Sequence, residues 1–280
     1  MNYLFTAAGE GSRFIKQGIK PPKPLIKVFG DELLIWSMRS FSFNKDDNVY
    51  IVTRKTHKCQ EIIKKKISRI FTNINIFWLE IDHLPNGQLM TAIIALENFK
   101  LEGNLIVHNC DTAFEMDARQ ITTLVKDINK NYAFFPVFEA KGDHWSFAET
   151  MPNSEKIIRI TEKERISSNC SIGTYIFNSA SEFLCDAKKY IKEIRPNKNL
   201  GEYYISPFLN YLCNQGKEIK MISAKNPKLF GNLDELLENF EISFQELISE
   251  NSWSDNQRKT LVVDIDGTIC GSPKNRDYSK

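Results

Sequence analysis

The sequence has no Cys-x-x-Cys pair. The six cysteines are scattered at positions 59, 110, 170, 185, 213 and 270. This spacing argues against a zinc site and against a disulfide framework as organising features. A reducing cytoplasm is therefore the expected environment.

A strong charge of one sign is also missing, and so is a long apolar run. The net charge is only +2, which provides no general basic field for nucleic acid. The densest basic cluster, residues 64–66, lies between isoleucines at helical spacing and is expected to be a solvated helix face. The first apolar run, residues 3–8, is too short for a signal peptide, and no later run reaches the length of a membrane span. The sequence predicts neither a nucleic-acid partner nor a membrane.

Strand and helix patterns alternate along the first half of the chain. Strands are expected at 2–8, 48–53, 73–81, 103–111 and 132–139, and helices at 31–43, 57–68, 88–98 and 117–129. This order predicts an α/β fold with a Rossmann-like, mostly parallel twisted sheet and helices on both faces. The second half is more mixed, with strands expected at 155–161, 170–177 and 218–222, and helices at 179–192, 201–214 and 232–249.

A glycine turn follows the first expected strand, in the sequence Gly9-Glu10-Gly11-Ser12-Arg13. Parallel sheets bind ligands at the carboxyl ends of their strands, and glycines let backbone N–H groups approach a phosphate closely. Two glycines alone are equally typical of an ordinary turn. A dinucleotide-binding turn would need a third glycine where Phe14 stands, so that interpretation is disfavoured.

Two cations lie close to this turn. Arg13 ends it, and Lys23 follows between Pro22 and Pro24, which stiffen the chain. Fixed positive charges beside bare backbone indicate a site for a highly charged anion.

The order Ala-Ala-Gly-x-Gly-x-Arg at 7–13, then Pro-Lys-Pro-Leu-Ile at 22–26, resembles the signature of the sugar-phosphate nucleotidyltransferases, or nucleotide-sugar pyrophosphorylases. Further similar segments are found at 86–96, 105–111, 160–165, 170–177 and 201–220. The likeness covers about residues 1–245 and implies a GT-A-like nucleotidyltransferase fold.

The resemblance also implies roles for individual residues. Nucleotide binding falls to Ala8, Gly9, Gly11, Ser12, Arg13, Lys23, Gly87 and Gln88. Acceptor binding falls to Glu162, Lys163 and Gly173. Arg13, Lys23 and Asp111 form the implied catalytic set, in which Asp111 holds Mg²⁺. Family members commonly carry a second metal-binding Asp at a position where this chain has Leu229, so that ligand is either absent or supplied by Asp234 in a shifted alignment.

The implied reaction joins an NTP (CTP, UTP, dTTP or GTP) to a sugar phosphate, or to a smaller phosphorylated polyol, amino acid or amino alcohol. A phosphate monoester has a second pKa of about 6, so it is already an anionic nucleophile and needs no side-chain base. The products are pyrophosphate and an activated precursor, expected to serve capsule or lipopolysaccharide synthesis. A homodimer is left open.

Two other functions compete with this interpretation. A GT-A-type glycosyltransferase shares the α/β half and Mg²⁺, but it typically carries Asp-x-Asp where this chain has the single acid Asp111. A non-catalytic nucleotide-binding regulator would bind an NTP without turnover.

The end of the chain carries a second motif. Residues 1–249 are expected to form the nucleotidyltransferase domain, and 250–259 a polar linker. In residues 260–280, "LVVDIDGTI" resembles the first motif of haloacid-dehalogenase-like phosphatases, with Asp264 as nucleophile and Asp266 as general acid/base. Only 14 residues follow Asp266, so this fragment of a second α/β domain is expected to be inactive and the chain to be cut from a longer bifunctional protein.

Overall fold

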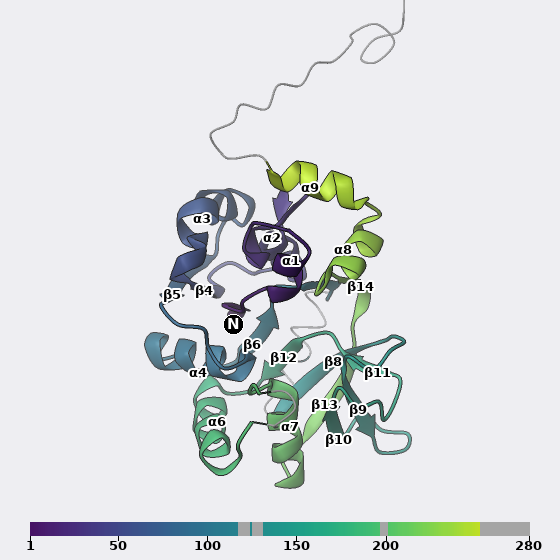
Figure 1. Cartoon of the computed structure of the whole chain (residues 1–280). Helices are drawn as coiled ribbons and strands as arrows, with labels where there is room; N and C mark the ends of the chain where they lie inside the picture. Colours follow the sequence, from purple (N-terminus) through teal and green to yellow (C-terminus); the bar gives the residue numbers. More distant parts are fainter. Residues whose placement is uncertain (117–123, 125–130, 197–200, 253–280) are drawn as a thin grey trace, which may run out of the picture.

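A computed structural model describes residues 1–116, 124, 131–196 and 201–252 of the chain (Figure 1). Most of the helix expected at 117–129, the end of the expected linker and the phosphatase-like motif with Asp264 and Asp266 lie outside the described residues.

One half of the central sheet is parallel. Its strands are β1 (Asn2–Ala7), β4 (Asn48–Arg54), β5 (Asn75–Ile81) and β6 (Leu105–Asn109), in the order β6-β1-β4-β5. Every residue of β1 is buried, as is typical of a central strand covered on both faces. The carboxyl ends of these strands form one edge of the sheet.

The other half is mostly antiparallel. It contains β8 (Ala133–Glu139), β9 (Ser146–Thr150), β10 (Ile157–Glu162), β11 (Asn169–Ser171) and β12 (Thr174–Phe177), and β12 joins it to β6. A further strand, β13 (Ile219–Ser223), runs parallel to β8. The α/β fold class predicted from the sequence is confirmed, and the mixed second half agrees with the irregular pattern expected there.

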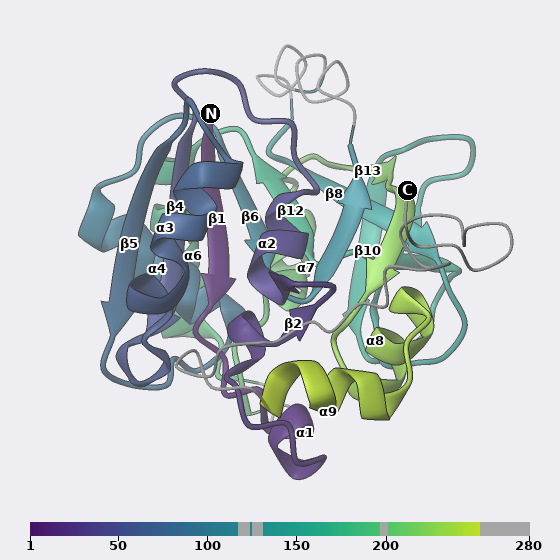
Figure 2. The same ribbon diagram turned by 90° about the horizontal axis from the view of Figure 1, so that it is seen from above.

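Helices cover both faces of the sheet (Figure 2). On one side lie α2 (Leu33–Met38) and α3 (Cys59–Ile70), and on the other α4 (Gln88–Phe99), α6 (Ala180–Glu193) and α7 (Ile205–Asn214). Successive side chains of β1 point to opposite faces of the sheet. Leu4 packs in the hydrophobic core on the α4 and α6 side, whereas Tyr3 and Phe5 pack in the core on the α2 side. This period of two fixes the strand between two hydrophobic layers. No helix among the described residues is long and apolar enough to cross a bilayer.

A smaller apolar cluster lies beyond the edge of the sheet. Its residues come from α1 (Ser12–Lys16), β2 (Lys27–Val28), the start of α2, α8 (Leu233–Phe240), α9 (Phe244–Ser252) and the loops and strand ends beside them. The 3₁₀ turn η1 (Lys23–Leu25) precedes β2, and β3 (Asp31–Glu32) pairs with it. The remaining short elements are the strands β7 (Thr112–Glu115) and β14 (Lys225–Leu229), which pair with one another, and η2 (Lys55–His57). This cluster docks the glycine loop and α8 against the end of the sheet.

Several expected elements differ from those observed. The strand expected at 170–177 is two strands, because the chain turns at Gly173, where φ is 77°. The helix expected at 232–249 is two helices, separated by Glu241 at φ 53°. Helix α9 continues to Ser252, three residues beyond the end of the expected helix, and Glu250 accepts hydrogen bonds from the backbone of Phe29 and Gly30.

Candidate active site

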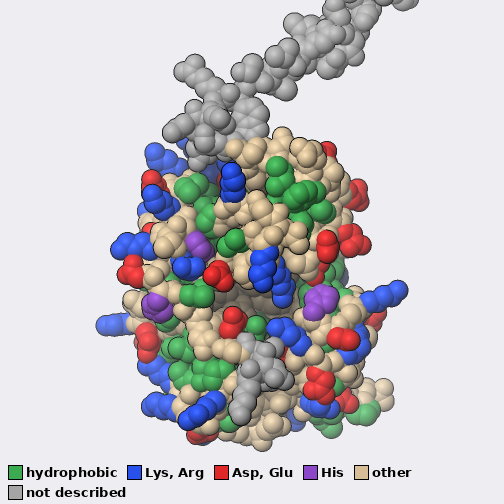
Figure 3. Space-filling model, in the orientation of Figure 1, with side chains coloured by type: hydrophobic (Ala, Val, Ile, Leu, Met, Phe, Trp, Pro, Cys, Tyr) green, Lys and Arg blue, Asp and Glu red, His purple; other side chains and the backbone are tan. Residues whose placement is uncertain are grey.

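A pocket of about 460 Å³ opens at the carboxyl edge of the parallel strands. The space-filling view shows a hollow at the centre of this face, with acidic and basic side chains around it (Figure 3). Its walls come from the glycine loop, η1, the start of α4, the turn after β6, the ends of β9 and β10, and the residues around 173, 202–204 and 231–235. A concave, polar site at this edge is the usual ligand position in such sheets.

The glycine loop forms one wall of the pocket. Gly11 has a φ of 70°, and a Cβ at this position would lie 3.1 Å from the Cβ of Lys23, so a side chain would be strained and crowded. The backbone N–H groups of Gly9, Glu10 and Gly11 make no hydrogen bond with any described residue. Free N–H groups in a glycine turn suit phosphate oxygens.

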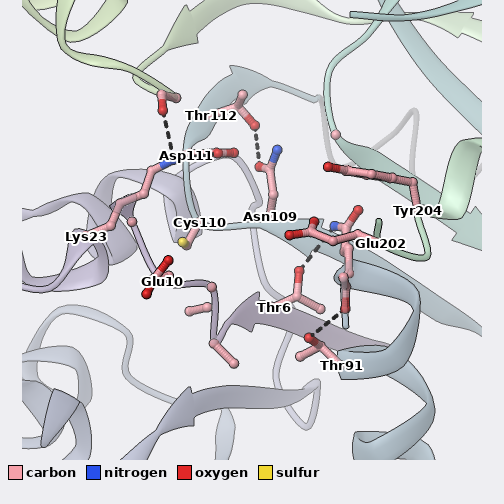
Figure 4. Close-up of a pocket in the computed structure, with 18 of the residues that line it drawn as sticks. Thr6, Glu10, Lys23, Thr91, Asn109, Cys110, Asp111, Thr112, Glu202 and Tyr204 are labelled. Atoms are coloured by element: carbon pink, nitrogen blue, oxygen red, sulfur yellow. Dashed lines mark hydrogen bonds and ion pairs between the residues drawn. The ribbon is translucent and has the colours of Figure 1, made fainter. Parts of the chain in front are cut away.

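Lys23 and Asp111 meet on the floor of the pocket (Figure 4). The Lys23 Nζ lies 2.6 Å from Asp111 Oδ2 and 3.1 Å from the carbonyl oxygen of Gly231. Both side chains are partly open, at 13% exposure for Lys23 and 29% for Asp111. Arg13, in helix α1 two residues after Gly11, is exposed and makes no hydrogen bond or ion pair with a described residue.

A buried histidine holds the turn that carries Asp111. His108 Nε2 lies 3.1 Å from the carbonyl oxygen of Thr112, so Nε2 carries the proton, and Nδ1 accepts from the Thr174 hydroxyl at 2.7 Å. Burial lowers the pKa of His108 to about 4, which keeps the ring neutral in this role. The side chain therefore spans Cys110 and Asp111, the two residues between β6 and β7, and fixes the position of Asp111.

The start of α4 forms the opposite wall. A Cβ at Gly87 would lie 2.4 Å from the carbonyl oxygen of Tyr203, so the backbone at this turn tolerates only glycine. Leu89 N donates to that same carbonyl, which docks the helix start on the 203 segment. Gln88 Nε2 donates to Thr6 Oγ1 at 3.1 Å, and Thr6 Oγ1 in turn donates to the carbonyl oxygen of His108. The Gln88 amide is thereby tied to the end of β1.

A third wall carries the expected acceptor residues. Glu162 accepts a hydrogen bond from the Ser146 hydroxyl, and burial raises the pKa of this carboxyl although Ser146 and Lys163 oppose the shift. The Lys163 backbone has φ 57°, and its Nζ lies 5.1 Å from the ring centre of Tyr204. The close-up shows Tyr204 and Glu202 together on this side of the pocket (Figure 4).

Gly173 makes room for a neighbouring side chain. A Cβ there would lie 1.9 Å from Asn109 Nδ2, and Asn109 N donates to the Gly173 carbonyl at 3.2 Å. Asn109 itself lines the pocket next to Asp111, and Thr112 Oγ1 lies 2.6 Å from its Oδ1. The absence of a side chain at 173 thus lets the Asn109 amide reach the cavity.

The structure brings every residue that the sequence assigned to nucleotide, metal or acceptor to this one pocket. They are Ala8, Gly9, Gly11, Ser12, Arg13, Lys23, Gly87, Gln88, Asp111, Glu162, Lys163 and Gly173. The lining residues missed from the sequence include Thr6, Asn109, His144, Trp145, Ser146, Glu202, Tyr204 and Glu235. Asn109 lies in the similar segment 105–111, and Glu202 and Tyr204 lie in the segment 201–220, but neither segment singled them out as site residues. The other missed residues lie outside the segments that carried the resemblance.

The donor atoms around Asp111 suit a hard divalent cation. The Asp111 carboxylate and the Gly231 carbonyl already surround the positive head of Lys23 with oxygen. Mg²⁺ prefers carboxylate and phosphate oxygens of this kind. Asp111 could therefore hold Mg²⁺ together with phosphate oxygens from a ligand.

Comparisons with known proteins identify a family and similar folds. A family model described as nucleotidyl transferase matches residues 4–255. The structure is similar to a nucleoside-diphosphate-sugar pyrophosphorylase from Vibrio cholerae RC9, with 26% identity and a TM-score of 0.71, over 86% of this chain and 100% of that one. A UDP-glucose pyrophosphorylase complexed with UDP-glucose shares the fold, with 18% identity and a TM-score of 0.66, over 86% of this chain and 97% of that one. No curated protein sequence matches the chain.

Proposed function

This chain belongs to the nucleotidyl transferase family, and from that premise we propose that it joins an NTP to a phosphorylated small molecule and releases pyrophosphate. The observation that carries the proposal is the arrangement of Lys23 and Asp111 beside the free N–H groups of the glycine loop, in one pocket with Glu162 and Lys163. The similarity to a nucleoside-diphosphate-sugar pyrophosphorylase supports a sugar phosphate or a related phosphate as the acceptor.

Each part of the two substrates has its own binding residues in the pocket. Backbone N–H groups of Gly9 and Gly11 bind triphosphate oxygens, and Arg13 binds the pyrophosphate that leaves. Lys23 neutralises charge near the α-phosphate, where the new bond forms. Lys163, on the far wall, holds the acceptor phosphate in line with that atom.

A phosphate monoester attacks the α-phosphorus, and the bond to the pyrophosphate oxygen breaks. The nucleophile is already an anion, so the protein needs to position it and to neutralise charge, not to remove a proton. Mg²⁺, held by Asp111, would neutralise charge on the phosphate oxygens during transfer. The carboxylate of Glu162 lies beside Lys163 and is placed to accept hydrogen bonds from the acceptor.

The substrates follow from the same resemblance. CTP, UTP, dTTP and GTP are the candidate nucleotides, and the acceptors are a sugar phosphate or a smaller phosphorylated polyol, amino acid or amino alcohol. The neighbouring phosphatase-like motif supports a role in making capsule or lipopolysaccharide precursors.

Pyrophosphate release tests the proposal directly. The four NTPs are combined with a panel of such phosphates in the presence of Mg²⁺, and at least one pair is expected to turn over. Asp111→Asn should reduce the rate to less than about a tenth, because losing a metal-held charge costs several kcal/mol of barrier. Asp234→Asn, an exposed acid outside the pocket, is the matched control. Sugar transfer from a nucleotide sugar without pyrophosphate release would instead identify a glycosyltransferase, and NTP binding without turnover a regulator.

A further inference from the structure

The family resemblance leads one to expect a second metal-binding carboxylate beside Asp111, but neither of the two positions that the sequence offers for it provides one. Leu229, at the expected position, pairs with Thr112 between strands β14 and β7 and carries no ligand atom. Asp234, the alternative, is exposed and does not line the pocket. Neither position supplies a second acid beside Asp111.

Glu235 does reach the pocket, through a gap left by a glycine. A Cβ on Gly231 would lie 3.1 Å from Glu235 Oε2 and 3.7 Å from Asp111 Oδ2. The two carboxylate oxygens therefore lie on the same side of Gly231, no farther apart than the sum of these distances. The space that a side chain at 231 would occupy is taken by the carboxylate of Glu235, which extends from α8 toward Asp111.

The local fold holds this carboxylate in place. Asn232 caps α8 by accepting from the Glu235 backbone N–H at 3.0 Å, and Glu235 Oε2 accepts from Gly231 N at 3.0 Å. On its other side, Glu235 Oε1 lies 3.1 Å from His144 Nε2. The side chain is only 16% exposed. These bonds fix its orientation, and each carboxylate oxygen keeps a further lone pair for another partner.

The oxygen atoms that face one another around Gly231 form a position suited to a cation. Gly231 contacts Glu235 directly and Asp111 through Lys23. Its N–H donates to the Glu235 carboxylate, and its carbonyl accepts from the Lys23 ammonium, which also contacts Asp111. Asp111 Oδ2, Gly231 O and Glu235 Oε2 are all hard oxygen donors. Neighbouring carboxylates repel each other, which favours a cation between them, and Lys23 bonds only Asp111 of the two.

We propose that Glu235 is the second metal-binding carboxylate of this chain, in place of an acid at Leu229 or Asp234. The inference rests on the proposed function for the identity of the metal, Mg²⁺, but the site itself is defined by Asp111, Gly231 and Glu235. Glu235 acts from a helix and not from the end of a strand.

Binding of Mn²⁺ alone, without nucleotide, tests the assignment independently of activity. The fall in the electron paramagnetic resonance signal of free Mn²⁺ measures its dissociation constant for the folded protein. Glu235→Gln should raise that constant at least about tenfold, since a charged ligand is lost while the amide oxygen can still accept from Gly231 N. Asp111→Asn should have a similar effect. Asp234→Asn, the neighbouring exposed acid, should stay within about twofold of wild type.

A rescue variant separates metal binding from helix capping. Aspartate at 231 would point its carboxylate into the same space, and the Gly231 backbone does not have positive φ. The double variant Gly231→Asp/Glu235→Ala, in which the shortened side chain at 235 leaves this space free, should therefore regain Mn²⁺ binding to within about threefold of wild type. A capping role for Glu235 alone predicts no such recovery.

Three results would overturn the assignment: wild-type protein that binds no Mn²⁺ up to about 1 mM, Glu235→Gln binding that matches wild type, or a double variant without recovery. The proposed function fails by a different result, the absence of pyrophosphate release across the whole substrate panel. The two failures are therefore distinguishable.

Discussion

The ammonium of Lys23 lies 2.6 Å from the Oδ2 atom of Asp111, although 88 positions separate the two residues in the chain. Lys23 belongs to a 3₁₀ turn after the glycine loop, and Asp111 to the turn between β6 and β7. Their contact joins the turn after the glycine loop to the end of β6. In the proposed function, triphosphate and Mg²⁺ would replace this ion pair with new partners for both side chains.

Replacing Lys23 or Arg13 should lower the rate mainly through kcat. Lys23→Ala is expected to reduce kcat by about 10²–10³, because its charge meets charge that develops in the transition state. Arg13→Ala should act in the same sense on the leaving pyrophosphate. Steady-state kinetics with varied NTP check this, with the exposed Lys16→Ala of helix α1 as the control. An increase confined to KM would make the residue a uniform binder and not a catalytic one.

Gly87→Ala should destabilise the protein by about 2–4 kcal/mol, since it adds a backbone clash to the strain of positive φ. The added Cβ would lie 2.4 Å from Tyr203 O at a φ of 99°. Gly18→Ala is the matched control, because Gly18 has φ 82° but open space around it. Urea unfolding of both variants gives the comparison, and equal losses would mean that the Tyr203 contact relaxes without cost.

Acid should destabilise the fold through His108. Its folded pKa, lowered by burial to about 4, lies below the usual value of 6.5, so the unfolded state binds more protons between these two pKa values. The contribution is present above about pH 6.5 and is lost as the pH falls toward about 4, by about 3 kcal/mol in total. His108→Gln should flatten this part of the pH profile of unfolding, whereas the exposed His83→Gln should not. If the stability of the wild type and of both variants changed with pH in the same way, His108 would not be the source of the acid sensitivity.

Removing residues 256–280 should leave nucleotidyl transfer unchanged within a few-fold. The family model ends at residue 255, and the pocket is lined by residues between 6 and 235. The pyrophosphate-release assay on the shortened chain makes the test. A larger loss in kcat/KM would show that the end of the chain takes part in this active site.

The sequence alone determined the fold class and one side of the site. Apolar strands alternate with amphipathic helices through the first half, and this periodicity reflects which faces are buried, so β1, β4, β5, β6 and the helices between them were predictable. The glycine loop, Lys23 and Asp111 were predictable because their chemistry is encoded within short contiguous motifs.

Only the tertiary structure decided the rest. Whether a side chain at one position reaches a partner a hundred residues away depends on how separate elements pack, and local patterns do not encode this. Gly173 illustrates the point, because its missing Cβ matters only beside Asn109. Glu235 illustrates it more strongly. In the sequence it is one acid among several on an amphipathic helix, next to Asp234, and packing of α8 against the turn at Gly231 places its carboxylate, and not that of Asp234, opposite Asp111.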